Sequence, residues 1–529
     1  MKKRLKVEEI DITYPLIQNF AFAHIYYDKE KKELIYEVIE PKLTKEEEKI
    51  LNLIKEVIID YFEVDINTLK DPKALSSVVE NAFKNVLKDL KIKLDANKLY
   101  KISYYIYRDF VGFNEIEPLL NDGYIEDISC SGVNIPIYVL HSLYGNLKTN
   151  IIFDSEEKLK SLILKFAQRS GRYVTYAEPL LEATLPDGSR VSATFVSEVS
   201  TRGPSFTIRK FREKPFSIVE LIQLGTLNSE IAAYLWFLIE HRASILIIGG
   251  VGSGKTTLLT CIGAFFRPEA KIVSIEDTRE LRFVHEHWTP LLTRTGFGIP
   301  LPSGSKYGEV TLFDLLRESF RMNPDYVIVG ETRGKEAYVM FQGMASGHAA
   351  LSTFHAENVD ALVKRLIAPP IELPASLLES LDLVISMTKA KEISESARRI
   401  REITEIVSVD KTTGEIMKNI VFVWNPFEDK YERMNESQKI RSICLKYGIT
   451  YENALKEIED RKRVIDWLVQ NNKKEYKEVA EIIKMYYLSK ETVMNLIEGK
   501  ITIEEAREIA FEEEEKTIGK LKFVILKEV

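Results

Sequence analysis

The spacing of apolar residues changes along this chain of 529 residues, and each spacing predicts a different kind of element. In the Lys- and Glu-rich residues 1–120, segments such as EEEKILNLIKEVIIDYF (46–62) place apolar residues three and four apart, on one face of a helix. From 121 to 215, short apolar runs such as IPIYVL (135–140) are separated by turn residues, which predicts strands. We therefore predict a helical amino-terminal region, 1–120, and a small α+β domain, 121–215.

Residues 216–430 alternate apolar strands with helical patterns, the order that a mostly parallel α/β sheet requires. Beyond them the chain is helical again, because RKRVIDWLV (461–469) and YKEVAEIIKMYY (476–487) each carry an apolar face. EEEE (512–515) is most simply a solvated face. The predicted fold class is α/β, with a P-loop domain at 216–430 and a helical tail at 431–529.

The strongest chemical signal is SILIIGGVGSGKTTLL (244–259), in which a buried strand precedes a glycine-rich loop and a helix. Gly249, four residues, and then Gly254-Lys255-Thr256 match the P-loop motif at every position. A glycine-rich turn without catalytic consequence is the alternative, but the complete motif in this context favours nucleotide binding. The residues expected to bind the nucleotide are Gly249, Gly250, Val251, Gly252, Ser253, Gly254, Lys255, Thr256 and Thr257.

Each part of this loop has a physical task. Glycines allow backbone N–H groups to point at one anion, and the start of the helix adds its dipole. Lys255 should reach the β- and γ-phosphates, and Thr256 should offer its hydroxyl to Mg²⁺. ATP and Mg²⁺ are therefore the expected cofactors.

Two more strands end in carboxylates. KIVSIEDTREL (271–281) ends in Glu276-Asp277 with Glu280 close behind, and DYVIVGETRG (325–334) ends in Glu331. Carboxyl ends of neighbouring parallel strands converge on the crevice where ligands bind, so these groups could face a metal-bound nucleotide and an attacking water. Each alone could also be a solvated loop residue. Gly330 stands where many P-loop nucleotidases carry an Asp that helps to hold magnesium.

GMASGHAALSTFHAEN (343–358) contains His348 and His355, two of the seven histidines in the chain. Metal ligation is one interpretation, although neither a Cys nor a third His accompanies them. A position beside the γ-phosphate is better supported by the surrounding glycine and small polar residues. A structural His that satisfies a backbone carbonyl is the third interpretation.

Composition narrows the class of protein. A net charge of −7 argues against a general nucleic-acid binder, so no specific nucleic acid is expected. The three cysteines lie far apart without a C-x-x-C pair, so we expect no zinc module and a reducing interior. No apolar run follows the charged amino terminus MKKRLKVEEIDI, so we expect no signal peptide. No apolar run approaches 18 residues, so we expect no membrane span.

Four segments, in this order, resemble the secretion ATPase superfamily that powers type II secretion, type IV pili and archaeal filaments. They are its Walker A loop (GGVGSGKT), Asp box (SIEDTREL), Walker B strand (YVIVGETRG) and His box (GMASGHAALSTFHAEN). The archaeal branch is most similar, because RTGFG follows the Asp box and RLIAPPIELPASLLESLD (365–382) follows the His box. YIEDISCSG (124–132) and STRGPSFTIRKF (200–211) resemble the amino domain of that branch, and the resemblance covers about 100 to 490.

The resemblance implies a RecA-like ATPase domain in which Gly before the Walker B Glu is normal and ATP is hydrolysed. By position, Glu331 and Thr256 would support magnesium, and Glu331 would also position water. Glu276 and Glu280 would supply acidic groups near the γ-phosphate, and which Glu polarises the water stays open. His348 and His355 would contact the γ-phosphate region.

Relatives also bring arginines to the nucleotide from the amino domain or a neighbouring subunit, and such a finger can raise the rate roughly 10³ to 10⁵-fold. Arg190 in PDGSRV, with Arg202 and Arg209 in TRGPSFTIRKF, stand at matching places. Arg294 and Arg333 are further candidates. Any one of them could instead be a surface or ion-paired Arg.

By resemblance, the chain would be a cytoplasmic motor, peripheral to the inner face of the cell membrane. It would form a homo-hexamer and act on a polytopic membrane platform protein to assemble or rotate an archaeal pilus or archaellum. A traffic ATPase for secretion or conjugation is one alternative, and a nucleotide-dependent docking scaffold without turnover is another. The zinc module of bacterial extension ATPases is missing, and GIPLPSGSKYGEV (298–310) is longer than the usual link, so a contact surface could differ there.

Overall fold

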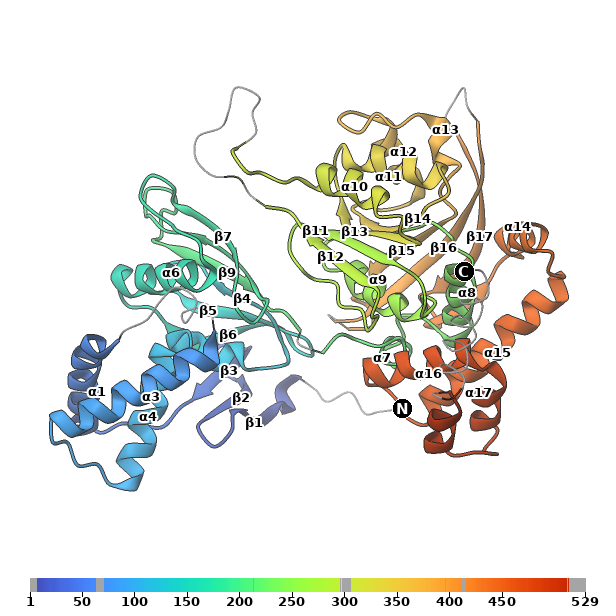
Figure 1. Ribbon diagram of the computed structural model, residues 1–529. Helices are drawn as coiled ribbons and strands as arrows, with labels where there is room; N and C mark the ends of the chain where they lie inside the picture. The colour runs from blue at the N-terminus through green and yellow to red at the C-terminus, as the bar shows by residue number, and fades with distance from the viewer. Residues whose placement is uncertain are drawn as a thin grey trace, which may run out of the picture. The chain divides into compact units, whose positions relative to one another are not determined.

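The computed structural model describes residues 7–62, 71–212, 214–294, 296, 306–394, 396–410, 415–510 and 512. The chain divides into two compact units, Met1–Glu213 and Lys214–Val529 (Figure 1). The boundary predicted at 215/216 is close to this division, whereas those at 120/121 and 430/431 fall inside a unit. Residues 298–305 of the predicted insert and 513–515 of the acidic run lie outside the described residues.

In the described part of the first unit, nine strands form one sheet in the order β1-β2-β3-β6-β5-β4-β9-β8-β7. Neighbouring strands run antiparallel except β3 and β6, which are parallel. The strands are β1 (Asp11–Ile17), β2 (Ala21–Asp28), β3 (Glu33–Ile39), β4 (Ile125–Cys130), β5 (Pro136–His141), β6 (Gly145–Ile152), β7 (Leu180–Thr184), β8 (Arg190–Thr194) and β9 (Ser205–Arg209).

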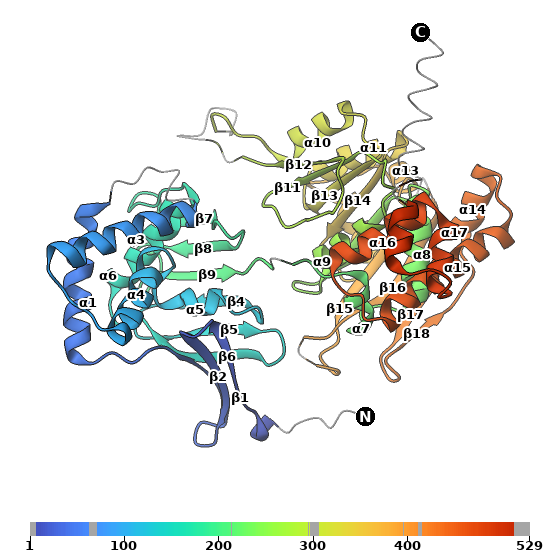
Figure 2. The ribbon, with the colours of Figure 1, turned by 60° about the horizontal axis from the view of Figure 1, so that its bottom comes forward.

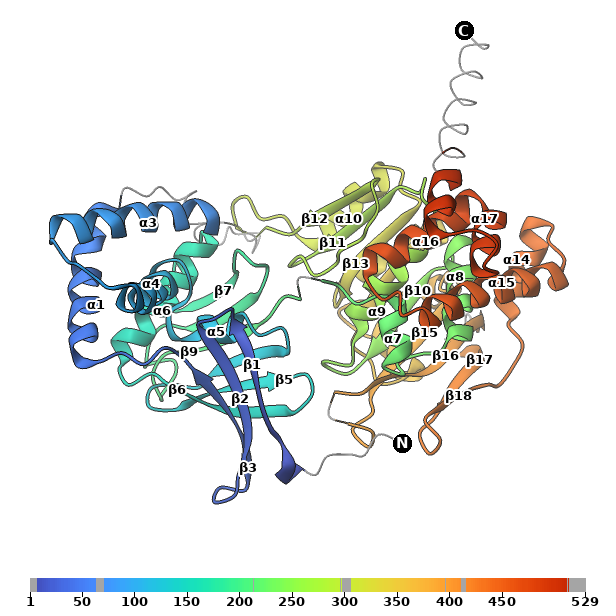
Figure 3. The same ribbon diagram turned by 90° about the horizontal axis from the view of Figure 1, so that it is seen from below.

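The helices of this unit are α1 (Lys45–Ile58), α3 (Pro72–Asp89), α4 (Ala96–Phe110), α5 (Glu117–Leu120) and α6 (Glu156–Ser170). Helix α1 begins in a capping box formed by Thr44 and Glu47. Helices α1, α3 and α4 bury an apolar cluster of their own that includes Ile54, Val79 and Ile102, and they lie together in Figure 3. Helix α6 packs instead on the core of the sheet.

The prediction of helices was wrong for residues 11–39, which form β1, β2 and β3. Buried and half-buried positions alternate along the first part of β2, and this period belongs to a strand. Asp122 accepts hydrogen bonds from the hydroxyls of Tyr14 and Tyr36, each at 2.6 Å, and so ties β1 and β3 to the rest of the unit. The Lys and Glu content of the segment concealed this pattern.

The second unit also carries a sheet of nine strands within the described residues, in the order β12-β11-β13-β14-β10-β15-β16-β17-β18. Strands from β12 to β15 in this order pair in parallel, and those from β15 to β18 pair antiparallel. The predicted α/β class with a mostly parallel sheet is confirmed. The strands are β10 (Ile245–Gly249), β11 (Ile272–Glu276), β12 (Trp288–Leu292), β13 (Tyr326–Thr332), β14 (Ala349–Phe354), β15 (Leu383–Lys389), β16 (Arg398–Val409), β17 (Ile416–Asn425) and β18 (Lys430–Arg433).

Helices cover both faces of this sheet, which explains why its central strands are continuously apolar. Ile245 and Ile247 of β10 face one cluster, with α8 and the tail helices, while Leu246 and Ile248 face another, with α11 and α12. The helices are α7 (Ile218–Gln223), α8 (Ser229–Glu240), α9 (Lys255–Ile262), α10 (Leu312–Arg321), α11 (Glu336–Ala345), α12 (Val359–Ile367), α13 (Ala375–Leu378), α14 (Gln438–Tyr447), α15 (Tyr451–Gln470), α16 (Tyr476–Leu488) and α17 (Lys490–Ile497).

The predicted helical tail is present and packs on α8 (Figure 2). Trp236 of α8 is fully buried, and its indole N–H donates to the hydroxyl of Tyr487 at 2.9 Å. Glu405 of β16 is also fully buried and accepts hydrogen bonds from the hydroxyl of Tyr234 at 2.8 Å and from the backbone N–H of Gln438 at 2.8 Å. A carboxylate of the sheet therefore caps the first helix of the tail.

Candidate functional site

The P-loop joins the end of β10 to the start of α9, which begins at Lys255. Gly249, Gly252 and Gly254 have φ angles of +153°, +67° and +92°, which side chains rarely tolerate. A Cβ atom on Gly249 would also lie 2.5 Å from the carbonyl oxygen of Met387. The glycines therefore permit both the curl of the loop and its close approach to β15.

Lys255 is buried inside this curl. Its Nζ donates to the carbonyl oxygens of Gly249 at 3.1 Å and Gly250 at 3.0 Å, and it lies 3.5 Å from Nδ1 of His355. Thr256 is the second residue of α9, at the amino end of the helix. A buried ammonium at the start of a helix, inside a glycine cradle, suits the phosphates of a nucleotide.

Glu331, near the end of β13, is half-buried between two basic groups. Its Oε1 lies 2.8 Å from Nε2 of His355, and Arg333 forms an ion pair with its other oxygen. Burial alone would raise the pKa of Glu331, but the hydrogen bond and charge of Arg333, aided by His355 and Lys255, lower it. Glu331 is therefore a carboxylate at neutral pH.

His355 directly follows β14 and connects Glu331 to Lys255. Burial and the neighbouring Lys255 charge lower the pKa of His355, which keeps the ring neutral at pH 7. A neutral ring has one N–H, and because Nδ1 faces the Lys255 ammonium, that N–H is assigned to Nε2. Nε2 lies 2.8 Å from Oε1 of Glu331 without forming a hydrogen bond to it. Three residues from three elements thus form one chain of polar contacts.

Glu276 ends β11 in much drier surroundings. It is 3% exposed, and its Oε1 accepts the backbone N–H groups of Glu280 at 2.8 Å and Leu281 at 2.9 Å. Burial raises the pKa of Glu276 to about 7. Its Oε2 is buried and, among the described residues, has no hydrogen-bond partner, so this oxygen is available to a proton or to a bound water.

Gly330 explains why β13 carries no Asp before its Glu. Strands β11 and β13 are parallel neighbours with Ile275 opposite Val329, so Glu276 lies beside Gly330. A Cβ atom on Gly330 would stand 2.9 Å from Cγ of Glu276. The space that a side chain at 330 would need is filled by the carboxylic side chain of the neighbouring strand.

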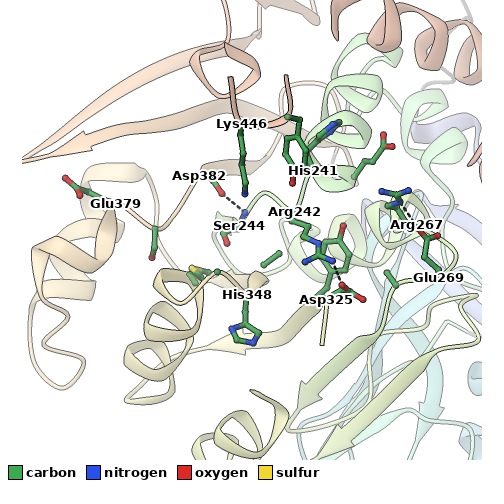
Figure 4. A pocket seen from close by; sticks show the side chains of 18 residues that line it. His241, Arg242, Ser244, Arg267, Glu269, Asp325, His348, Glu379, Asp382 and Lys446 are labelled. Atoms are coloured by element: carbon green, nitrogen blue, oxygen red, sulfur yellow. Dashed lines mark hydrogen bonds and ion pairs between the residues drawn. The ribbon is translucent and has the colours of Figure 1, made fainter. Parts of the chain in front are cut away.

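The expectation for His348 is wrong. His348 precedes β14 and His355 follows it, so the six residues of the strand separate them by about 20 Å. His348 lines a pocket of about 740 Å³ at the opposite edge of the sheet, together with Arg242, Asp325 and other residues (Figure 4). It cannot contact the phosphates held by the P-loop of its own chain, and it cannot share a metal ion with His355.

The arginines stand in different parts of the chain. Arg190 of β8 and Arg209 of β9 are opposite each other in the first unit, and the carbonyl oxygen of Arg202 accepts the N–H of Val133 in that unit. Their approach to the nucleotide stays a prediction. In the second unit, Arg294 donates to the carbonyl oxygen of Gly308 at 2.7 Å, whereas Arg333 takes part in the site through Glu331.

The predicted Mg²⁺ ion can be compared with the side-chain oxygens near the P-loop. Mg²⁺ usually keeps several waters and binds one or two protein oxygens together with the phosphates, and Thr256 with Glu331 fits that pattern. Within the described ranges, no group of three or more His, Cys, Asp or Glu side chains could hold a metal ion by itself.

Two basic residues that the sequence did not suggest, Lys389 and Arg398, also lie against the P-loop. Lys389 ends β15 and Arg398 begins β16. Only the order of strands in the sheet, which places β15 beside β10, brings them there. A search for basic residues at the carboxyl end of each strand would have found Lys389.

A P-loop on a central parallel strand, with carboxylates at the ends of two nearby strands, defines a P-loop nucleotide-binding protein. Residues 114–523 match the family model described as type II/IV secretion system protein. The chain belongs to this family, as its four motifs predicted.

None of the described helices is both long and apolar enough to span a membrane.

Several relatives are similar over different lengths. An uncharacterized protein of Methanocaldococcus jannaschii is 36% identical over 500 residues, which cover 90% of this chain and 89% of the relative. The type IV secretion system protein PtlH of Bordetella pertussis is 30% identical over 231 residues, covering 40% of this chain and 67% of its own length. The solved structure of the Legionella pneumophila ATPase DotB is 18% identical, with a TM-score of 0.38 over 74% of this chain and 92% of that one.

Proposed function

We propose that this protein is a Mg²⁺-dependent ATPase that drives a type II/IV secretion-type machine. The observation that carries the proposal is the chain of contacts from Lys255 in the P-loop through His355 to Glu331. This arrangement joins a phosphate-binding cation to an ionised carboxylate that could orient a water. The neighbouring Glu276 adds a second acidic group to the same edge of the sheet.

The residues divide the work of phosphoryl transfer among them. The loop N–H groups and Lys255 bind the β- and γ-phosphates, and bound Mg²⁺, held by Thr256 and Glu331, would neutralise their charge. The ionised Glu331, fixed by His355, orients the attacking water. Glu276 has the pKa best matched to receiving a proton near neutral pH, because general bases work best close to the operating pH.

The proposed machine is an archaeal type IV pilus or archaellum. The support is the similarity of the motifs to the archaeal branch, together with a relative in M. jannaschii aligned over most of both chains. The protein would act as a homo-hexamer at the cytoplasmic face of the membrane, on a polytopic platform protein. Arginines 190, 202 and 209 would approach the nucleotide as the two units move.

A traffic ATPase for secretion or conjugation is the second candidate, favoured by the 30% identity to the type IV secretion system protein PtlH over 231 residues. The two candidates share the catalytic residues and differ in the membrane partner. Affinity purification from detergent-solubilised membranes should recover a platform protein of the filament machine. Recovery of a conjugation coupling protein, without a platform protein, would favour the second candidate.

Phosphate release tests the enzymatic proposal directly. Wild-type protein with Mg²⁺ and ATP should release phosphate, at higher rates with membrane lipids, and Lys255→Ala should reduce release to background. Lys430→Ala, which removes the same charge from a side chain paired with Glu428, is the matched control and should behave as wild type. Background rates in all three proteins, with nucleotide still bound by the wild type, would favour the docking scaffold and overturn the ATPase.

A further inference from the structure

Strands β15 and β16 place two basic side chains beside each other next to the P-loop. Strand β15 runs parallel to β10, with Met387 opposite Gly249. It then turns back into β16, and the last pair of the antiparallel ladder is Lys389 opposite Arg398. Directly opposed residues in such a ladder present their side chains on the same face. The ladder therefore delivers two cations to one place.

Both side chains touch the outer part of the loop, which we call the crest (Val251–Ser253). Arg398 Nε donates to the carbonyl oxygen of Gly252 at 2.6 Å. A Cβ atom on Gly252 would lie 3.0 Å from Nζ of Lys389, so the ammonium is in contact with the crest. Lys389 is exposed, and no carboxylate of the described residues forms an ion pair with it.

Arg399, the next residue along β16, fixes this arrangement from the other side of the strand. Its Nε and Nη2 bind the two carboxylate oxygens of Asp429 at 2.7 Å and 2.8 Å. Such a two-pronged ion pair has a defined geometry, and Arg399 is only 3% exposed. The start of β16 is therefore held in place while Arg398 reaches the loop.

The two cations stand on the side of the loop away from the catalytic groups. Strand β10 lies between β14 and β15, and His355 and Glu331 come from the β14 and β13 side. A nucleotide whose terminal phosphate meets Lys255, His355 and Glu331 must extend its α-phosphate and ribose in the other direction. That direction leads to Lys389 and Arg398.

We propose, on the basis of the ATPase function above, that Lys389 binds the ribose end of the nucleotide. Arg398 is a positioning residue that holds the crest through the Gly252 carbonyl group. The pair gives the site a preference for a nucleoside phosphate over an inorganic polyphosphate, because only the former places a group beside Lys389.

Calorimetric titration with ADP and with tripolyphosphate, which lacks a nucleoside, tests this assignment in the full-length chain. Lys389→Ala should weaken ADP binding about tenfold, or 1.4 kcal/mol, and tripolyphosphate binding less than about twofold. Lys391→Ala removes the same charge two residues further along the chain and should change neither affinity.

Two other results would contradict the role of Lys389 or the ATPase proposal on which it rests. Equal ADP affinities for wild type and Lys389→Ala, or equal losses for both probes, would overturn the role of Lys389. A wild type that binds neither probe would instead remove the ATPase proposal and this inference with it.

Arg398 is tested by a pair of variants and by steady-state kinetics. Arg398→Ala should weaken both probes about tenfold, since the whole crest relaxes, and should raise KM more than it lowers kcat. Arg398→Lys should recover part of the affinity, because the Lys ammonium can still donate to the carbonyl oxygen of Gly252. Thermal unfolding of each variant distinguishes this result from a general loss of structure. Arg398→Ala with unchanged affinities at an unchanged midpoint would contradict the positioning role.

Discussion

Glu276 and Glu331 stand at the ends of the adjacent parallel strands β11 and β13, yet their carboxyl groups meet different surroundings. Glu331 is half-buried and has Arg333 and His355 as partners, and its pKa is lowered. Glu276 is almost fully buried with two backbone N–H donors on one oxygen, and its pKa is raised to about 7. Pairs of carboxyl groups with separated pKa values often divide acid–base roles in this way.

The second acidic group of this site therefore comes from the neighbouring strand β11 and not from the residue before Glu331. In a nucleotidase with Asp-Glu, both acidic groups come from one strand, and as neighbours along it they point to opposite faces of the sheet. Here Gly330 has no side chain, and the space beside it is occupied by Glu276 of β11. The Glu276 side chain is one methylene longer than that of Asp and is almost fully buried. The site therefore has one fixed charge and one group that titrates near neutrality.

The largest expected effect is the loss of the fixed charge. Glu331→Gln keeps the size of the side chain but removes the negative charge that faces His355 and Arg333. We expect kcat to fall by about 10³, within the range for lost acid–base groups, while ADP binding persists. Glu357→Gln, at an exposed position two residues beyond His355, is the control. Unchanged turnover in Glu331→Gln would contradict the role given to this strand.

The raised pKa of Glu276 should make the free energy of unfolding depend on pH. Because the pKa of Glu276 is raised from 4.5 to about 7 in the folded state, its protonated form stabilises the fold below about pH 4.5. That contribution, at most about 3 kcal/mol, is lost as the pH rises through about 7. Denaturant unfolding of the second unit at pH 5 and pH 8 should show this loss in wild type and much less of it in Glu276→Gln. Parallel pH profiles would rule out the raised pKa.

Filling the space at Gly330 should disturb Glu276 before it disturbs anything else. Gly330→Ala brings a methyl group to 2.9 Å from Cγ of Glu276, and such overpacking costs about 1–3 kcal/mol. We expect a lower unfolding midpoint and a loss of turnover of about tenfold or more. Adding Glu276→Ala should restore the midpoint but not the turnover. A double variant no more stable than Gly330→Ala would show that the contact is not the cause.

The smallest effect compares the two histidines across the sheet. His355→Asn removes the ring between Lys255 and Glu331, and we expect a loss of turnover of about tenfold. His348→Asn changes the opposite edge of the sheet and should alter turnover less than about twofold. Equal losses for both variants in a phosphate-release assay would contradict the separation of the two edges.

What the sequence could predict was local. The P-loop, the acidic strand ends and the alternation of strands and helices are each encoded within a few residues, so the α/β class and Lys255, Glu276 and Glu331 followed from them. His348 was misplaced because the six residues of an apolar strand span the whole sheet, whereas the same number in a loop does not. Closeness in sequence was taken for closeness in space.

Contacts between distant segments could not be predicted in this way. The strand order that brings β15 beside β10 determines that Lys389 and Arg398 reach the loop. The first three strands were missed because charged residues interrupt their alternation, and because they join the sheet through β6, far along the chain. Both facts depend on topology, which a single sequence does not state.

The carboxylate of Glu405 links the stability of the sheet to that of the tail. It is fully buried, and its hydrogen-bond donors include Ser437 and Gln438 from the start of α14. Deleting the tail would leave this charge in the interior without those donors, which costs several kcal/mol per ion. The tail and the nucleotide-binding sheet should therefore unfold in one cooperative transition, and the shortest fragment that folds should extend from about residue 214 to 510.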